Sequence, residues 1–332
     1  MEIGKVPNDI LEKIVFSNIK TKRKEVLVSA AIGEDNGIID FGESVCVVST
    51  DPITGATKDI GRLAIHISCN DVSTSGAEPI AVLLTILCPP TTTEEDLEEI
   101  MKDAAKAAAD INVEIIGGHT EVTDSVNRVI ISTTVIGKQL KSKLPNYADI
   151  KVGDKVVITK YAGIEGTSII AKELEEKLTD KLGKVKIEEA KNMDSMLSVV
   201  SEGIIAGRHN AKYMHDITEG GVYGAVWEAS IATKCGLIIH EDLIPMMEIT
   251  KEISKILEID PYRLISSGSM VIIMDDEDLK NLIIEFGNHN IKATVIGEII
   301  EEGTYFVKNG VKAIIDPPGS DELYRALKRG NK

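Results

Sequence analysis

The segment DIGRLAIHISCNDVSTSGAEP (Asp59–Pro79) decides how the first half of this chain folds. Asp59 is a residue type favoured just before a helix. The apolar residues that follow it recur with the spacing of one helical face. They are Ile60, Leu63, Ala64 and Ile67. We therefore expect a helix from Asp59 to about Gly76.

The pair Asn70–Asp71 falls late in this expected helix, where both residue types have poor helical propensity. The sequence Ser-Thr-Ser-Gly follows, instead of the charged pattern of a solvated helix face. Polar residues at positions that local rules disfavour are candidates for function. Asn70 and Asp71 are therefore candidate site residues, and capping of a helix or turn is the alternative.

Strands are expected on both sides of this helix. ESVCVVST (Glu43–Thr50) is rich in β-branched residues and leads into the loop DPITG, and IAVLLTILC (Ile80–Cys88) is an apolar run closed by two prolines. Thr93 and Asp96 have the spacing of a capping box, which predicts the start of a second helix. The alternation of strands and helices indicates an α/β (α+β) fold.

The sequence GGHT (Gly117–Thr120) lies between two further expected strands, Val113–Ile116 and Arg128–Gly137. It fits a metal-binding histidine, a phosphate-binding loop or a tight turn. A zinc site needs partner ligands at suitable spacing, and the other histidines form no such pair. A phosphate turn with His119 and Thr120 as hydrogen-bond donors is the better functional interpretation, with a structural β-turn as the alternative.

The polar stretch KSKLPNYADIKVGD (Lys141–Asp154), with its proline and glycine, is expected to link two domains. The chain of 332 residues is long enough for two domains of about 150 residues each. We place the first domain at residues 1–148 and the second at 149–332.

In the second half, HDITEGGVYG (His215–Gly224) leads into an expected helix. Asp216 precedes a helix that starts near Gly220, and free backbone N–H groups at such an end favour an anion. An ordinary N-cap is the alternative interpretation.

Four carboxylates of the first half lie at expected strand or helix ends: Asp35, Asp51, Asp59 and Asp71. Mg²⁺ prefers oxygen ligands, and strand ends are where such ligands converge in α/β folds. The alternative for each aspartate alone is a cap of a helix or turn.

Composition excludes several classes of protein. The net charge of −16 disfavours nucleic-acid binding, because an acidic surface repels phosphate backbones. The start of the chain lacks the pattern of a signal peptide, and no apolar run is long enough to span a membrane. The four cysteines form no C-x-x-C pair. We expect a cytoplasmic protein with reduced thiols and no membrane or nucleic-acid partner.

The order of the motifs is more specific than any one of them. GED, TDPITG, DIGRLAIHISCNDVSTSGAEP, GGHTEV and HDITEGGVYGAVWEAS follow one another along the chain. This series resembles the aminoimidazole ribonucleotide (AIR) synthetase-like superfamily over nearly the whole chain, most closely its branch of hydrogenase expression/formation protein E. The resemblance implies a PurM-like fold of two domains, with ATP near a homodimer interface formed by the N-terminal domains.

The resemblance also implies roles for individual residues. Mg²⁺ would be bound by Asp35, Asp51 and Asp71. The nucleotide phosphates would be bound by Asn70, Gly117, Gly118, Thr120, Asp216 and Gly220. His119 and Asp71 would act in catalysis. The shared chemistry is activation of an oxygen by phosphorylation, in which positioning and charge neutralisation supply most of the catalysis.

Two departures from the hydrogenase-maturation branch bear on function. Those proteins end in a cysteine that carries the carbamoyl group, whereas this sequence ends in LKRGNK and its last cysteine is Cys235. They also have Asp and Lys where this chain has His119 and Glu121. We therefore do not expect carbamoyl dehydratase activity. The expectation is an ATP- and Mg²⁺-dependent enzyme acting on an unidentified small acceptor, and the alternative is a non-catalytic nucleotide-binding protein that serves a maturation partner.

Overall fold

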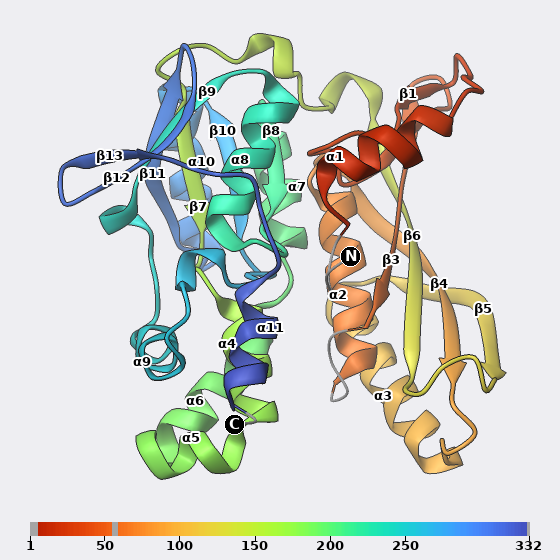
Figure 1. Cartoon of the computed structure of the whole chain (residues 1–332). Helices are drawn as coiled ribbons and strands as arrows, with labels where there is room; N and C mark the ends of the chain where they lie inside the picture. Colours follow the sequence, from red (N-terminus) through yellow and green to blue (C-terminus); the bar gives the residue numbers. More distant parts are fainter. Residues whose placement is uncertain (1–5, 55–58, 331–332) are drawn as a thin grey trace.

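The computed structural model describes residues 6–54 and 59–330. Gly55 of the DPITG loop and the outer ends of both predicted domains lie outside the described residues. Two α/β domains, each built on a mixed β-sheet, stand next to each other (Figure 1). The chain passes from one sheet to the other over residues 141–154, and the predicted boundary after residue 148 falls in this segment.

The first sheet has six strands in the order β1-β2-β3-β6-β4-β5. Only β4 and β5 are parallel neighbours, and the other pairs are antiparallel. The strands are β1 Val26–Val28, β2 Gly37–Asp40, β3 Ser44–Ile53, β4 Glu78–Cys88, β5 Glu114–Val122 and β6 Ile130–Leu140.

Two helices cover one face of this sheet. Helix α2 (Ile60–Ser73) packs on β3 and β6, and α3 (Glu94–Asp110) packs on α2. The predicted capping box is confirmed, because the Thr93 hydroxyl accepts from the Asp96 N–H and the Asp96 carboxylate accepts from the Thr93 N–H. A short helix, α1 (Asn8–Ile10), precedes the first strand.

The opposite face of the sheet carries partly or fully exposed side chains, and we call it the open face. Cross-strand pairing places Thr50, Thr134 and Leu83 in one row on it, and Val48 beside Ile136 in another. Leu83 is 37% exposed. An antiparallel sheet normally buries one apolar face, so the apolar side chains on this second face need an explanation.

The prediction of a turn at Gly117–Thr120 is wrong. Strand β5 continues through these residues, pairing Gly118 with Leu84 and His119 with Thr85 of β4. Gly117 and Gly118 have φ angles of +150° and +143°, which residues with a side chain rarely adopt. A Cβ atom on Gly118 would lie 1.9 Å from the Leu84 carbonyl oxygen. The glycines thus allow β5 to lie close to β4.

Substituting Gly118 with alanine is expected to destabilise the protein by about 3 kcal/mol or more, because unfavourable φ costs about 1–3 kcal/mol and the clash with β4 adds to it. Gly117→Ala is the matched control, since its Cβ would meet only the Leu83 side chain at 3.6 Å. Urea unfolding of both variants separates strain from clash. Equal losses in the two variants would contradict the close approach of β5 to β4.

The second sheet has seven strands in the order β13-β12-β9-β11-β7-β10-β8. Only β12 and β9 are parallel neighbours. The strands are β7 Lys155–Thr159, β8 Tyr213–Asp216, β9 Gly236–His240, β10 Met270–Met274, β11 Ala293–Ile300, β12 Thr304–Lys308 and β13 Val311–Ile314.

Eight described helices accompany this sheet, and none of the described helices of either domain is long and apolar enough to cross a membrane. Residues 184–208 form two helices, α6 and α7, with residues 192–199 between them. The helices are α4 Ile164–Glu173, α5 Glu175–Leu182, α6 Lys184–Lys191, α7 Val200–Arg208, α8 Gly221–Thr233, α9 Glu248–Leu257, α10 Asp276–Asn288 and α11 Glu322–Gly330.

Helix α2 joins the two domains (Figure 1). Its C-terminal end contacts α7 through Gly203, where a Cβ atom would lie 2.2 Å from the Ser73 carbonyl oxygen. Buried apolar residues of α2, α4 and α7 belong to one continuous core cluster. The carboxylate-bearing end of α2 is therefore fixed relative to the second domain.

Candidate functional site

Four aspartates come together where the two domains meet. Asp35 lies in the loop before β2, Asp51 in β3, Asp71 near the end of α2, and Asp216 at the end of β8. Asp71 is 6% exposed and Asp216 is 1% exposed. Three of the four were predicted as metal ligands and the fourth as a phosphate-site residue. The structure brings all of them into one cluster, which we call the acidic cluster.

Four carboxylates lie close together and two of them, Asp71 and Asp216, are buried, which makes the acidic cluster electrostatically unfavourable on its own. Burial, together with the carboxylates of Asp216, Asp51 and Asp35, raises the pKa of Asp71 well above its ordinary value. Burial and Asp35 raise the pKa of Asp216 in the same way. One oxygen of Asp216 has no hydrogen-bond partner among the described residues. Converging carboxylate oxygens with an unused acceptor fit a hard divalent cation such as Mg²⁺.

His215 is a site residue that sequence reasoning missed. Its Nδ1 lies 2.8 Å from Asp35 Oδ2, and its Nε2 lies 3.1 Å from Glu228 Oε2. Burial alone would lower the pKa of His215, but these two carboxylates raise it well above its usual value. With both ring nitrogens donating, His215 is an imidazolium and has no lone pair for a metal. It orients Asp35 and offsets part of the negative charge.

Asp71 and Asn70 have different roles although they are neighbours. The Ser49 hydroxyl donates to Asp71 Oδ2 at 2.6 Å, which orients this carboxylate in the acidic cluster. The Asn70 amide donates to the Leu197 carbonyl and accepts from the Val199 N–H, both at 2.8 Å. Both ends of this buried amide are used. Asn70 therefore joins the domains instead of making the predicted nucleotide contact.

The N-terminus of α8 was predicted to hold an anion through Gly220. The structure shows that this anion is part of the chain itself, because the Gly220 N–H donates to Asp321 Oδ2 at 2.7 Å. The other oxygen of Asp321 accepts from the N–H groups of Ile265 and Leu323. The prediction of a free phosphate site at Gly220 is therefore corrected, since Asp321 fills it.

The predicted phosphate segment Gly117–Thr120 does not reach the acidic cluster of its own chain. Asp51 and Gly118 share one cross-strand row, with β6 and β4 between them, so they are three strand spacings or about 14 Å apart. His119 pairs with Thr85, whose side chain is exposed on the open face, whereas the Asp51 side chain points towards α2. The two side chains therefore lie on opposite faces of the sheet. The His119 side chain is 66% exposed.

A cavity of about 920 Å³ opens beside the acidic cluster. Asp51 and Thr218 line its cluster end, and Glu165, Ser267 and Asp321 line the end formed by the second domain. Its volume lies within the range of ligand sites, about 300–1,000 Å³. A smaller hollow of about 320 Å³, lined by Asp35, lies between the first domain and the linker. Only the larger cavity has room for a nucleotide and a small acceptor together.

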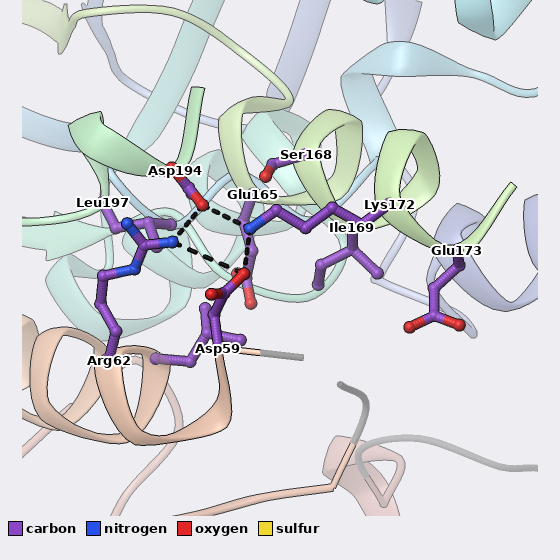
Figure 2. A pocket seen from close by; sticks show the side chains of 10 residues that line it. Asp59, Arg62, Glu165, Ser168, Ile169, Lys172, Glu173, Asp194 and Leu197 are labelled. Atoms are coloured by element: carbon purple, nitrogen blue, oxygen red, sulfur yellow. Dashed lines mark hydrogen bonds and ion pairs between the residues drawn. The ribbon is translucent and has the colours of Figure 1, made fainter. Parts of the chain in front are cut away.

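A network of four charged side chains links the two domains, as Figure 2 shows. Arg62 of α2 binds Asp194, and Lys172 of α4 binds both Asp194 and Asp59. Asp59 precedes α2 as predicted, but its carboxylate binds Lys172 instead of capping the helix. The hollow that these four residues line together with their neighbours has a volume of about 20 Å³, room for about one water molecule. The network therefore fixes the domains and is not itself a ligand site.

Glu165, which lines the cavity, makes the stability of the folded protein depend on pH. Burial raises the pKa of Glu165 from its ordinary 4.5 to about 7, although the nearby hydroxyl and N–H of Ser267 act to lower it. Because the folded state holds this proton more tightly than the unfolded chain does, its contribution is full below pH 4.5 and is lost as the pH rises through 7.

Glutamine does not titrate, so the unfolding free energy of Glu165→Gln relative to wild type should rise by up to about 3 kcal/mol between about pH 5 and about pH 8. Urea unfolding at both pH values measures this difference. Glu176→Gln, on the exposed surface of α5, should show no such rise. If the difference in unfolding free energy between Glu165→Gln and wild type does not change with pH, the raised pKa of the buried Glu165 carboxyl is contradicted.

Two domain families match most of the sequence. Residues 33–139 match "AIR synthase related protein, N-terminal domain", and residues 151–309 match "AIR synthase related protein, C-terminal domain". "Putative hydrogenase expression/formation protein MJ0676" of Methanocaldococcus jannaschii is 28% identical, over 97% of this chain and 96% of that protein. "Carbamoyl dehydratase HypE" of Cupriavidus necator is 26% identical, over 84% and 81%.

Solved structures show the same fold. The structure titled "AaThiL complexed with AMPPCP and TMP" has a TM-score of 0.75 at 17% identity and covers 97% of this chain and 98% of its own. A chain of the "HypE-HypF complex" has a TM-score of 0.71 at 23% identity, covering 93% and 99%. At these identities the likeness concerns the fold alone.

Proposed function

Because the chain belongs to the AIR synthase-related family, whose members HypE, thiamine-monophosphate kinase and PurL use ATP, we propose that it is an ATP- and Mg²⁺-dependent enzyme that phosphorylates an oxygen of a small acceptor. The observation that carries this proposal is the acidic cluster. Four carboxylates from both domains converge there beside a cavity large enough for two ligands.

The geometry supports the following roles. Asp35, Asp51, Asp71 and Asp216 would hold Mg²⁺, which when bound neutralises the phosphate charge that these carboxylates would otherwise repel. The imidazolium of His215 keeps Asp35 turned towards the other three carboxylates. Catalysis would then consist largely of positioning and electrostatic stabilisation of the transferred phosphoryl group.

We also propose that the protein is a homodimer paired through its open face. Apolar side chains such as Leu83 and Ile136 would then be buried, and the open face would acquire the second layer that it lacks within the described chain. The exposed Gly117–Thr120 segment of β5 borders this face. A second copy would supply this segment at the interface, where His119 and Thr120 could donate hydrogen bonds to phosphate.

The proposal is tested by thermal melting with Mg²⁺ and ATP. A ligand that binds only the folded state at about 100 times its Kd stabilises it by about 2.7 kcal/mol. We expect a rise in the melting temperature with Mg·ATP or Mg·AMPPCP, and a smaller rise with either component alone. The absence of any shift at millimolar Mg·ATP, in a folded protein, would overturn the proposal. A shift without ATP turnover across an acceptor panel would leave the accessory role, with a protein partner as in the HypE–HypF complex.

A further inference from the structure

The large cavity has a second polar end, formed by Glu165 and Ser267 of the second domain. Glu165 lies in the first turn of α4 and is 4% exposed, and Ser267 is fully buried. Among the described residues, neither Glu165 Oε2 nor Ser267 Oγ makes a hydrogen bond of good geometry, although the Ser267 hydroxyl and N–H lie near enough to the Glu165 carboxylate to lower its pKa. Leaving a buried polar group without a good hydrogen bond is unfavourable, so these two atoms are ones that a ligand would satisfy.

The charges around this end are predominantly negative. Asp321 and Glu219 line the same part of the cavity, and both raise the pKa of Glu165 and of Tyr324. Of the described residues that line the cavity, Arg128 is the only one with a basic side chain, and it belongs to the first domain. A negatively charged ligand group would be repelled here.

A metal ion does not fit the same atoms. Asp321 uses both carboxylate oxygens on backbone N–H groups, and Glu219 Oε1 accepts from the Tyr324 hydroxyl at 3.1 Å. The oxygens left without a good hydrogen bond are then one carboxylate oxygen and one hydroxyl, so the chain would supply only two of the six ligands of an octahedral Mg²⁺ site. A group with several N–H donors is satisfied by these two acceptors, and the charge-assisted hydrogen bond to Glu165 is the stronger kind.

We propose that Glu165 and Ser267 bind a cationic nitrogen group, an ammonium or guanidinium, of the acceptor substrate. This inference rests on the proposed function, because it names the substrate class of the same cavity. Ile169, Ile265 and Leu323 also line the cavity and provide apolar contact for the carbon skeleton. The acceptor's other end then faces Asp51 and the acidic cluster, where phosphoryl transfer would occur.

The test uses small probes and the full-length protein with saturating Mg²⁺, so that the acidic cluster does not attract the cation. Binding of methylguanidinium, acetamide and acetate is measured by ligand-observed saturation-transfer NMR. The variants are Glu165→Gln, Ser267→Ala and the surface control Glu176→Gln. We expect methylguanidinium to bind at least tenfold more tightly than acetamide and acetate. Glu165→Gln should weaken that binding at least tenfold, and Glu176→Gln should not change it.

Equal binding of the three probes, or unchanged methylguanidinium binding in Glu165→Gln, would overturn the inference. If Glu165→Gln does not fold, Ser267→Ala decides, with a loss of at least threefold expected and an unchanged affinity overturning the inference. The Mg·ATP melting shift of the same wild-type sample keeps the two proposals apart. Its absence contradicts the proposed function, whereas a normal shift without cation preference contradicts only the acceptor class.

Discussion

Asp71→Asn is expected to abolish most of the stabilisation by Mg·ATP and, at the same time, to make the ligand-free protein more stable. The asparagine keeps the shape of the side chain and can still accept from the Ser49 hydroxyl. It removes one of four clustered carboxylates, whose repulsion raises the pKa of Asp71. One pKa unit corresponds to about 1.4 kcal/mol, so a gain of at least about 1 kcal/mol without ligand is expected.

The loss of binding follows from the same substitution. Removing residues that merely support a metal ligand costs about 10–100-fold in affinity or activity, so loss of a ligand itself should cost about 100-fold or more. Melting curves with and without Mg·ATP measure both effects. Asp180→Asn on the exposed surface of α5 is the matched control and should change neither. A destabilised ligand-free Asp71→Asn protein that keeps its Mg·ATP shift would show that Asp71 acts only as a structural residue.

Leu83→Glu is expected to convert the proposed homodimer into monomers. Leu83 lies on the open face, in a row with Thr50 and Thr134, and is 37% exposed in the single chain. A charge buried without a partner at the interface would cost at least about 2 kcal/mol per copy. A symmetric interface contains the substitution twice, so the dimer Kd should rise on the order of 10³-fold.

Sedimentation equilibrium of Leu83→Glu and wild type measures this change. Val185→Glu is the control, because Val185 is an apolar residue of α6 that is 84% exposed and lies in the other domain. The monomer should also lose the Mg·ATP melting shift if the Gly117–Thr120 segment of a second copy completes the site. A monomeric wild type, or a Leu83→Glu protein that remains dimeric, would contradict pairing through the open face.

The parts of the fold with strong local signals could be predicted from the sequence. Helix α2 is specified by its apolar periodicity, and the start of α3 by the reciprocal bonds of Thr93 and Asp96. Asp71 stood out because it is polar at a position where helices disfavour it. The family resemblance implied that Asp71 and Asp216 serve one nucleotide site, but their convergence is seen only when both domains are folded together.

The remaining site residues depend on contacts that no local pattern encodes. Gly117–Thr120 has the composition of a turn, but its glycines serve a close pairing with β4 that only the tertiary structure reveals. Gly220 has the features of an anion site that is filled by Asp321, about 100 residues later in sequence. Glu165 looks like a first-turn carboxylate of a helix, and only its burial beside the cavity makes it a candidate ligand group.

The most direct test of the central claim is anomalous diffraction from crystals grown with Mn²⁺ and AMPPCP, since Mn²⁺ prefers the same oxygen ligands as Mg²⁺. The acidic cluster predicts a manganese peak coordinated by carboxylates of Asp35, Asp51, Asp71 and Asp216, with the phosphates of AMPPCP extending into the large cavity. A nucleotide bound with no manganese at these aspartates, or manganese bound only elsewhere on the protein, would contradict the account.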